Sequence, residues 1–520
     1  MNMNTRAFGT FSRRTGRRLA AAAALILCAG LAAPGRAQGL ALPERPVPDG
    51  TPRVDIRDFG ASGSASTARA AVVEGRKQIT VDKARDFRPG QGVTLSPAHE
   101  RYEDIRIYEP DTLFKDHAVT NQFELRGFDG KKTVWRTFVL DFGGGDPATF
   151  RWSNDMAFSW TNGVTITGGW QPLSDGVEIR FRTTAWTKGQ LATFHARSDL
   201  LTTIVSIKDN VFELADAPNL TASGVVVRHH DRLAIERALK AALDTKRGLY
   251  IPSGHYRIDK GFTVPGGKSI WIEGEDGQNA WLDIGEGSGA VFNLAGDEVT
   301  IRNLKLTGNG GWKLYPITFN RAHGAYFWTM ALRPSNAVSI GARRVWLENL
   351  NASKMSSECF YCGGGWRRNQ ASRAGTESLT YFRCTVKDVL FNAFNNNNFA
   401  DNTSILYCVV DGAANFWEGP SRFVRCIGNH VRNCMFYGTF GGCKHRTGYE
   451  FFNEFGTGQS IIANNVFEGL EQQDPARDPD YNRRILGPLV DGPAEQVIIC
   501  HHIRHIQSFL LPFLTAKLGS

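Results

Sequence analysis

The sequence predicts an all-β solenoid, a fold in which short strands wind into coils that stack on one another. Between residues 299 and 467 a β-branched or aromatic strand runs repeatedly into a turn with Asn, Cys or Gly, and a new strand then begins. The spacing recurs, since Asn303 and Asn349 lie 46 residues apart, or two coils of 23, and Cys384 and Cys408 lie 24 apart. No ten-residue helical pattern separates the strands, which disfavours βαβ units. Strands that return in parallel without helices must wind as coils that pair with their neighbours.

The residues at the turns fit this interpretation. Asn tolerates left-handed backbone and bonds locally through its amide, and stacked amides form hydrogen-bonded ladders. The run Asn395–Asn398 is therefore expected at a corner rather than in a strand. Cys384, Cys408 and Cys426 follow strands at one phase, which predicts an inward-facing stack of small apolar side chains. An antiparallel sandwich built from similar short strands is the alternative fold.

The first 37 residues have the pattern of a secretory signal peptide. Four arginines between 13 and 18 precede the apolar run AAAALILCAGLAA, and Gly35-Arg36-Ala37 offers small residues at the expected cleavage position. We expect cleavage after Ala37 and a secreted or periplasmic protein. The segment holds six Arg and no acid, so its removal lowers the formal net charge from +9 to +3 and removes the main support for nucleic-acid binding. No other stretch approaches the roughly 18 apolar residues of a membrane span.

The mature chain is expected to begin with a linker and then a strand, a helix and a second strand. Residues 38–67 contain a Pro-rich linker and VDIRDFGA, a strand and turn that start at residue 54. An amphipathic helix is predicted at 231–245, with Asp231 as its N-cap and residues 246–248 at its end. The buried strand GLYIPSGHYRI follows at once. The apolar face of the helix is formed by Ile235, Leu239, Ala242 and Leu243.

These elements resemble the opening of the pectate-lyase-like superfamily of right-handed parallel β-helices. The resemblance rests on VDIRDFGA, DRLAIERALKAA, GLYIPSGHYRI and WIEGEDG, and with the coils it covers about half of the chain. It implies a right-handed solenoid over residues 229–475 whose open end is capped by the helix, as solubility requires. The family includes lyases, hydrolases, epimerases and binding proteins, so the resemblance implies no single reaction.

One segment departs from that family, in which the DFGA element runs almost directly into the capping helix. Here residues 68–228 intervene and hold a rough duplication, since QITVDKARDFRPGQGVTLS from Gln78 is echoed by VEIRFRTTAWTKGQLATFH from Val177. We predict an inserted β-rich module, with a carbohydrate-binding sandwich as one interpretation. Its tryptophans are candidates for stacking on sugar rings, although each one alone is more often a core residue. They are Trp135, Trp152, Trp160, Trp170 and Trp186.

The last segment, 476–520, is expected to be irregular. The repeat fades after Leu470, and ICHHIRHIQSFLLPFLTAKLGS from Ile499 has no strand-turn phrase, which leaves a capping helix or a foreign end as alternatives. The CxxC of Cys359 and Cys362 lacks a second Cys pair or a His pair at metal spacing, so no zinc site is predicted.

A secreted solenoid of this family suggests a polysaccharide as its partner, and the charges then favour one reaction. Hydrolysis needs two carboxylates across the scissile bond, and Asp388, Asp401, Asp411 and Glu418 lie on neighbouring predicted coils. The Asp-Asp pair and the Gly-His-Gly of polygalacturonases are absent, and Ala322-His323-Gly324 is the nearest match. β-Elimination at a uronate instead needs a cation or amide on the carboxylate and a base for the C5 proton.

The densest polar cluster of the repeat favours β-elimination. We expect Lys444 or His445 as the base, Arg446 or Arg425 as the clamp on the substrate carboxylate, and Tyr449 as the acid. The other residues expected to hold the substrate are Arg422, Trp417 as a sugar platform, Glu418, Arg367 and Arg368.

The sequence therefore predicts an exported polysaccharide lyase that acts on an acidic, uronate-containing polymer. A glycoside hydrolase on the same scaffold and a non-catalytic glycan-binding or assembly protein are the alternatives. No cofactor or metal is predicted. For Ca²⁺ at Asp411 or Glu418, no contiguous acidic loop in the sequence offers support.

Overall fold

The computed structural model describes most of the chain between residues 52 and 436, and two later strands. The described ranges are 44–45, 52–108, 122–145, 147–154, 159–285, 287–310, 335–362, 376–390, 392–396, 400–418, 421–436, 459–468 and 496–503. The predicted signal peptide lies outside them. The chain divides into two compact units, Met1–Glu44 and Arg45–Ser520, and all that follows concerns the second. No described helix is long and apolar enough to cross a bilayer.

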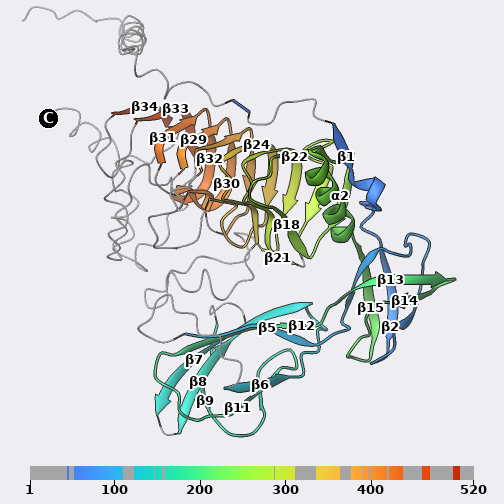
Figure 1. Ribbon diagram of the computed structural model, residues 1–520. Coiled ribbons are helices and arrows are strands. Elements are labelled where there is room, and N and C mark those ends of the chain that lie inside the picture. The colour runs from blue at the N-terminus through green and yellow to red at the C-terminus, as the bar shows by residue number, and fades with distance from the viewer. Residues whose placement is uncertain are drawn as a thin grey trace, which may run out of the picture. The chain divides into compact units, whose positions relative to one another are not determined.

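The strands from β16 to β34 pair in parallel with strands further along the chain, so the chain winds in coils. Figure 1 shows the strands of successive coils side by side in chain order. The described structure is almost entirely β, and its parallel pairing in this region confirms that part of the prediction. The antiparallel sandwich, the alternative for this region, is wrong.

Each coil contributes strands to three parallel sheets, here named A, B and C. Sheet A contains β1 (Arg53–Asp55), β16 (Gly248–Ile251), β19 (Ile270–Gly274), β26 (Ser378–Phe382), β29 (Ala400–Leu406) and β31 (Ser421–Ile427). Sheet B contains β17 (Gly254–Arg257), β20 (Ala280–Asp283) and β27 (Thr385–Lys387). Sheet C contains β18 (Lys260–Val264), β21 (Ser288–Leu294), β23 (Ser335–Ile340), β25 (Phe360–Cys362) and β28 (Asn392–Asn396).

Longer strands turn a corner and belong to two sheets. Those that pass from A to B are β22 (Glu298–Thr307), β24 (Arg344–Ser353), β33 (Gln459–Glu468) and β34 (Gln496–Ile503). Those that pass from B to C are β30 (Val409–Glu418) and β32 (His430–Phe436).

Residues with left-handed backbone set the corners. Between sheets A and B, Asn303 and Asn349 have φ of 57° and 50°, and Asn349 Nδ2 donates to Asn303 Oδ1 at 2.8 Å. The predicted role of Asn is confirmed for this pair, because a short amide makes left-handed backbone less costly. Left-handed residues at this corner on later coils are Arg383, Tyr407, Gly428 and Asn464, and at the corner between B and C they are Lys354, Asp388, Gly412 and Asn433.

The asparagine run does not form a corner. Asn395 and Asn396 lie in β28 and are fully buried, so the expectation for Asn395–Asn398 is wrong for its described residues. Their amides are bonded, as burial requires. Asn396 Nδ2 donates to Thr403 Oγ1 at 3.2 Å, and Asn395 Nδ2 donates to Glu358 Oε1 at 3.5 Å.

The three cysteines point into the core of the coils. Cys384, Cys408 and Cys426 are fully buried among apolar side chains, as predicted. They do not form one row, because Cys426 is the register partner of Ile405. On the next coil, Asn429 occupies the position that corresponds to Cys408, and its Oδ1 accepts from Cys408 N at 2.8 Å. The core row therefore passes from thiols to an amide on the later coils.

Helix α2 (Arg232–Thr245) covers the end of the stack at β1 and β16 (Figure 1), and its buried face confirms the prediction. Asp231 stands at the N-cap, but its carboxylate accepts from the backbone N–H of Ser62 at 2.8 Å rather than from the helix. The left-handed residue after the helix is Lys246, because Gly248 already opens β16. The buried residues of the helix are Ala234, Ile235, Ala238, Leu239, Ala242 and Leu243.

The chain continues to pair in parallel beyond the point where the repeat fades. Strand β34 pairs with β33 from Gln459↔Gln496 to Phe467↔Ile503. The sequence has no strand-turn phrase in this segment, and it was therefore expected to be irregular. A strand that covers a core needs apolar residues only at alternate positions, so the missing phrase does not exclude a strand.

Residues 67–230 form sheets of their own, with two separate apolar cores instead of one sandwich. A closed barrel holds the first core and contains β2 (Thr67–Val72), β3 (Gln78–Val81), β4 (Gly92–Ser96), β13 (Leu200–Lys208), β14 (Val211–Leu214) and β15 (Ala222–His230). The second core involves a five-stranded and a three-stranded antiparallel sheet. These contain β5 (Arg101–Tyr108), β7 (Trp135–Gly145), β8 (Ala148–Ser153), β9 (Thr161–Thr165), β12 (Leu191–Arg197), β6 (Phe123–Arg126), β10 (Gln171–Pro172) and β11 (Glu178–Phe181).

The sequence echo appears as the same turn in both cores. Before β4, Arg88 N donates to Gln91 Oε1 at 2.8 Å, and before β12, Thr187 N donates to Gln190 Oε1 at 2.7 Å. In each turn the glycine between donor and acceptor has a positive φ, of 83° and 85°. The duplicated stretch of sequence therefore forms one local turn before β4 and the same turn before β12.

The module's tryptophans are at least partly covered. Trp186 lies in the second core and stacks on Phe142 with ring centroids 3.8 Å apart. Trp170 lies against the guanidinium groups of Arg126 and Arg180. Trp135, Trp152 and Trp160 are half-buried.

Candidate functional site

Most of the residues predicted to carry the chemistry lie outside the described residues and stay predictions. In chain order, the segments that contain them follow directly on two strands of sheet C, β25 and β32. The residues are Arg367 and Arg368 after β25, and Lys444, His445, Arg446 and Tyr449 after β32.

Trp417 is fully buried in the core of the coils, so its predicted role as a sugar platform is wrong. Strand alternation gives the reason. Trp417 is the register partner of the core residue Phe394, whereas the next residue, Glu418, is the partner of Asn395 on the other side of the strand.

Arg425 and Arg422 lie in β31 of sheet A, so the coil separates them from the end of β30. Arg425 is only 4% exposed, and its Nη1 donates to Ser404 Oγ at 3.4 Å. Burial lowers the pKa of Arg425. The clamp role of Arg425 therefore requires a substrate group to reach a largely covered guanidinium, and it stays a prediction.

Four neighbouring strands of sheet C end directly before residues outside the described ranges. Strands β25, β28, β30 and β32 are consecutive neighbours in this sheet. Each of them ends directly before residues outside the described ranges, namely 363–375, 397–399, 419–420 and 437–458. Because parallel strands end at the same edge, the chain leaves this edge four times on neighbouring coils. Binding and catalytic residues concentrate on loops that a rigid scaffold positions in this way.

Sheet C also carries a carboxylate that the sequence analysis missed. Glu358 stands just before β25, where Ser357 Oγ donates to its Oε2 at 2.8 Å and Asn395 Nδ2 reaches its Oε1 at 3.5 Å. Asn395 is the register partner of Tyr361 on one side and of Glu418 on the other. No motif marks Glu358 in the sequence, and only the register of the coils brings it to Asn395.

Sheet B presents a row of mixed charge. Asp411 Oδ2 accepts from Arg432 at 2.9 Å and its Oδ1 accepts from Asn433 at 2.6 Å. Burial acts to raise the pKa of Asp411, but these hydrogen bonds hold it below its ordinary value. The register partners across the coils are Arg257, Asp283, Thr307, Ser353, Lys387, Asp411, Arg432 and Glu468.

Metal chemistry finds no support among the described residues. No group of three His, Cys, Asp or Glu is placed there to hold an ion. Both oxygens of Asp411 are already engaged, which disfavours the calcium site considered there. Cys359 and Cys362 are buried free thiols, and burial raises the pKa of Cys362 to about 11, so neither offers a ready thiolate.

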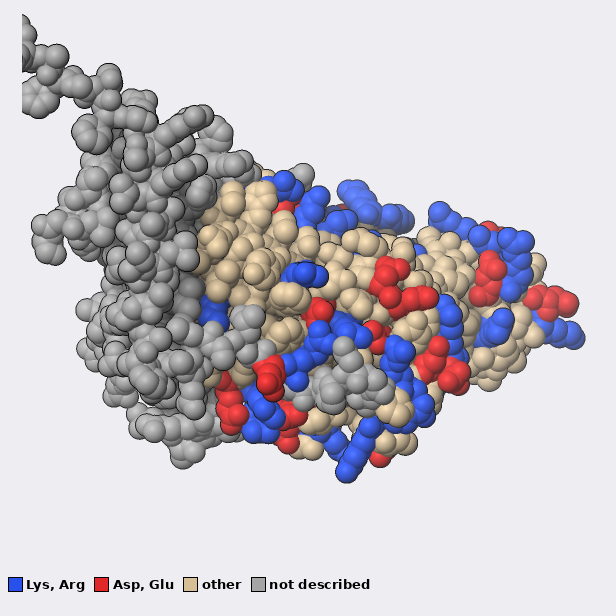
Figure 2. All heavy atoms as spheres, turned by 90° about the horizontal axis from the view of Figure 1, so that it is seen from above, with Lys and Arg blue, Asp and Glu red and all other residues tan. Residues whose placement is uncertain are grey.

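The outward row of sheet A changes from charged to apolar along the coils. On early coils Arg302 Nε donates to Glu273 Oε1 at 2.8 Å. On later coils Tyr407 is 55% exposed, and its ring lies edge-on to Phe382 with centroids 6.1 Å apart. Figure 2 shows charged side chains of both signs over part of this view, and a broad uncharged area beside the undescribed residues. The register partners in the apolar part are Phe382, Leu406, Ile427 and Ala463.

No model of a protein family matches this sequence, and no curated protein matches it. The comparison with solved structures gives several matches at low sequence identity and low TM-score, of which three are described next. The catalytic unit of a GH87 α-1,3-glucanase from Streptomyces thermodiastaticus is 11% identical over 78% of this chain and 73% of its own, with a TM-score of 0.25. The Escherichia coli ybhc protein is 11% identical over 51% and 71%, with a TM-score of 0.30. The tailspike of Acinetobacter phage vB_ApiP_P1 is 13% identical over 46% and 50%, with a TM-score of 0.18. At these scores the likenesses carry no conclusion about the activity of this chain.

Proposed function

We propose that the coils form a right-handed parallel β-helix and that the exported protein binds and cleaves a polysaccharide along sheet C. The observation that carries the proposal is the placement of Glu358, Asn395 and Glu418 together on neighbouring coils. Four chain segments leave the same edge beside them. The right hand is expected because crossovers between parallel strands of one sheet are right-handed in nearly all proteins.

Hydrolysis of a glycosidic bond is the reaction that two such carboxylates support best. Strands β25 and β30 are two inter-strand steps apart in sheet C, which is about 10 Å. The paired carboxyl groups of glycosidases lie about 5 to 9.5 Å apart, which is of the same order as this separation between the strands.

The two glutamates would divide the acid and base roles. Ser357 Oγ donates to Glu358 Oε2 and Asn395 Nδ2 donates to Glu358 Oε1, so two hydrogen bonds position this carboxylate for the role of base. Glu418 would donate a proton to the leaving oxygen as the anomeric C–O bond breaks. Glu358 would accept a proton from the water whose oxygen bonds to the anomeric carbon. The proton balance closes with one proton given and one taken.

β-Elimination is the second candidate, because the segment that holds Lys444 and His445 follows β32 at the same edge of sheet C. On a uronate, the base would remove the C5 proton, the electron pair would form the C4–C5 double bond, and the glycosidic oxygen would leave C4 with a proton from Tyr449. This route requires an acidic polymer, whereas the hydrolytic route does not.

A panel of neutral and uronate-containing polysaccharides tests the proposal and separates the two reactions. Both reactions create new reducing ends, but only β-elimination creates an unsaturated product with ultraviolet absorbance. Reducing ends without that absorbance support the glutamate pair. Reducing ends with it support the Lys444 segment in its place. Binding without any new reducing ends overturns both and leaves a glycan-binding protein.

A further inference from the structure

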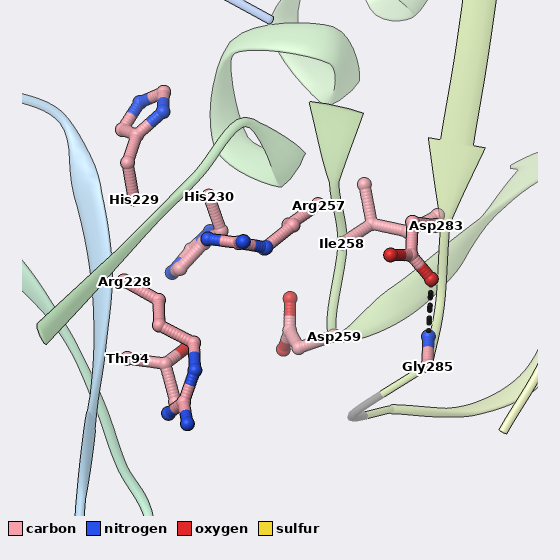
Figure 3. A pocket seen from close by; sticks show the side chains of 9 residues that line it. All are labelled: Thr94, Arg228, His229, His230, Arg257, Ile258, Asp259, Asp283 and Gly285. Atoms are coloured by element: carbon pink, nitrogen blue, oxygen red, sulfur yellow. Dashed lines mark hydrogen bonds between the residues drawn. The ribbon is translucent and has the colours of Figure 1, made fainter. Parts of the chain in front are cut away.

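An open cleft with a volume of about 70 Å³ lies where β15 runs into α2, away from sheet C (Figure 3). Side chains from the end of β15 and from the ends of β17 and β20 line it. The groups used below are Arg228, His230, Arg257, Asp259 and Asp283.

Backbone bonds and an ion pair hold the walls of this cleft in place. Asp231 N donates to Arg257 O at 2.9 Å, which ties the end of β15 to the end of β17. Arg232 Nε lies 3.2 Å from Asp259 Oδ1. The residues next to His230 and Asp259 are therefore tied to each other by this hydrogen bond and this ion pair.

His230 is the least satisfied polar group of the cleft. It is 4% exposed, and neither of its ring nitrogens makes a hydrogen bond. Figure 3 shows its ring turned into the cleft, whereas the ring of His229 points to the other side of β15. The imidazole ring packs against Gly92 of β4, and a Cβ at that position would collide with it. A buried imidazole without partners lowers folding stability, and a ligand that pairs with its ring nitrogens would offset that cost.

The protonation of the lining groups favours a polar ligand. Burial and the charge of Arg232 lower the pKa of His230 to about 4, so near neutral pH the ring offers one donor and one acceptor. Burial raises the pKa of Asp259. Burial would also raise that of Asp283, but hydrogen bonds led by the one from His255 keep it low.

Asp283 is a fixed acceptor. His255 Nε2 lies 2.8 Å from its Oδ2, while Gly285 N and Thr307 Oγ1 donate to its Oδ1 at 3.0 and 2.9 Å. Arg228 is positioned by a hydrogen bond from its Nη1 to Ser96 Oγ at 2.6 Å. Rigid carboxylates and a neutral imidazole suit the hydroxyls of a sugar ring, and guanidinium groups suit a carboxylate.

We propose that this cleft is a second, non-catalytic binding site for one acidic sugar unit, a hexuronate, held by Arg228 and Arg257 at its carboxylate and by His230, Asp259 and Asp283 at its hydroxyls. The proposal rests on the proposed function only in taking a glycan as the partner. Its test measures only the binding of a sugar to this cleft. A failure to detect cleavage along sheet C therefore leaves this proposal standing, and a failure of sugar binding in the cleft leaves the proposed cleavage standing.

The test compares the full chain with His230→Leu in thermal unfolding and isothermal titration, with glucuronate and glucose as probes. Leucine fills a similar volume without ring nitrogens, so we expect the variant to unfold at a higher temperature than the wild type when no sugar is present. We also expect glucuronate to raise the unfolding temperature of the wild type and to bind His230→Leu at least tenfold more weakly. His99→Leu is the matched control, since His99 lies outside the cleft lining, and its affinity should be unchanged.

Three results would overturn the proposal. Equal affinity of the wild type for glucose and glucuronate removes the role of the arginines. Equal affinity of His230→Leu and the wild type for glucuronate removes the role of the imidazole. No binding of glucuronate to the wild type at millimolar concentration removes the site. If His230→Leu does not fold, Arg228→Gln supplies the same affinity comparison from the exposed side of the cleft.

Discussion

Asn395 Nδ2 lies 3.5 Å from Glu358 Oε1, and the two residues are 37 apart in the chain. The contact joins β28 to the short segment that precedes β25, and the same asparagine is the register partner of Glu418 on the following coil. This relationship is the basis of the proposed site on sheet C.

Glu358→Gln should abolish most of the cleavage activity and leave the fold intact. The amide keeps the shape of the side chain but cannot take a proton, and general base catalysis contributes about 10²- to 10⁴-fold. We expect kcat to fall by at least 10²-fold, with an unfolding midpoint within the error of the wild type. Glu377→Gln, at an exposed glutamate just before β26, is the control and should keep full activity. Full activity of Glu358→Gln would rule out its role as base.

Trp417→Ala should reduce stability rather than glycan affinity. The indole is fully buried in the core of the coils, and truncation of a buried Trp costs about 3 to 5 kcal/mol. Urea unfolding measures the loss, and glycan affinity is measured under conditions where the variant stays folded. A variant with wild-type stability and lost affinity would contradict the inward placement.

Asn429→Ala should also destabilise the coils. Asn429 Oδ1 accepts from Cys408 N at 2.8 Å, and its Nδ2 donates to Asn465 Oδ1 at 2.8 Å. The substitution leaves the buried Cys408 N–H without its partner, whereas Asn465 Oδ1 keeps the hydrogen bond from the backbone N–H of residue 429 at 2.9 Å. A buried polar group without a partner costs about 1 to 3 kcal/mol, and we expect a loss of this size in urea unfolding. Gln278→Ala, at an exposed position, should change stability by less than about 0.5 kcal/mol.

Asp231 should make the stability of the protein depend on pH. Burial raises its pKa from 3.8 to about 7, against hydrogen bonds from the backbone N–H groups of Ser62 and Gly63. The folded state therefore keeps the proton to higher pH than the unfolded chain does. This contribution to stability is complete below about pH 4 and is lost as the pH rises to about 7, by up to about 4 kcal/mol.

Asp231→Asn isolates this effect because asparagine does not titrate. We expect the difference in unfolding free energy between variant and wild type to move in the variant's favour between pH 4 and 7 and to stay constant above pH 7. His229 and His230, whose pKa burial lowers to about 4, titrate in both proteins and cancel in the difference. A difference that is constant from pH 4 to 8 would show that Asp231 is ionised in the folded state. Urea titrations at half-unit pH steps measure it.

The parts of the fold that sequence reasoning predicted are those with a local cause. The recurring strand-turn phrase predicts coils because a fixed repeat length brings each strand back beside its predecessor. The helical spacing of Ile235 and Leu239 predicts the face that α2 buries. The duplicated turn is visible because Gln91 and Gln190 each bond to a residue three positions earlier.

The parts that sequence reasoning missed depend on register. Trp417 and Glu418 are neighbours in the chain, yet a shift of one residue decides which of them enters the core. Polar composition suggested a corner for Asn395, but pairing with Tyr361 places it inside a strand, where hydrogen bonds to other coils satisfy its amide. Local preference was overruled by contacts that the sequence does not bring close.

By itself, the sequence determined that the chain winds in parallel coils, that α2 buries one face, and that Cys384 and Cys408 point inward, because periodicity and strand alternation act over a few residues. Tertiary structure alone decided which distant side chains share a site. Glu358 reaches Asn395, and His230 sits against Gly92, only because the lengths of the intervening segments set the register between strands. Register is a property of paired strands rather than of either strand, so no single segment of the sequence contains it.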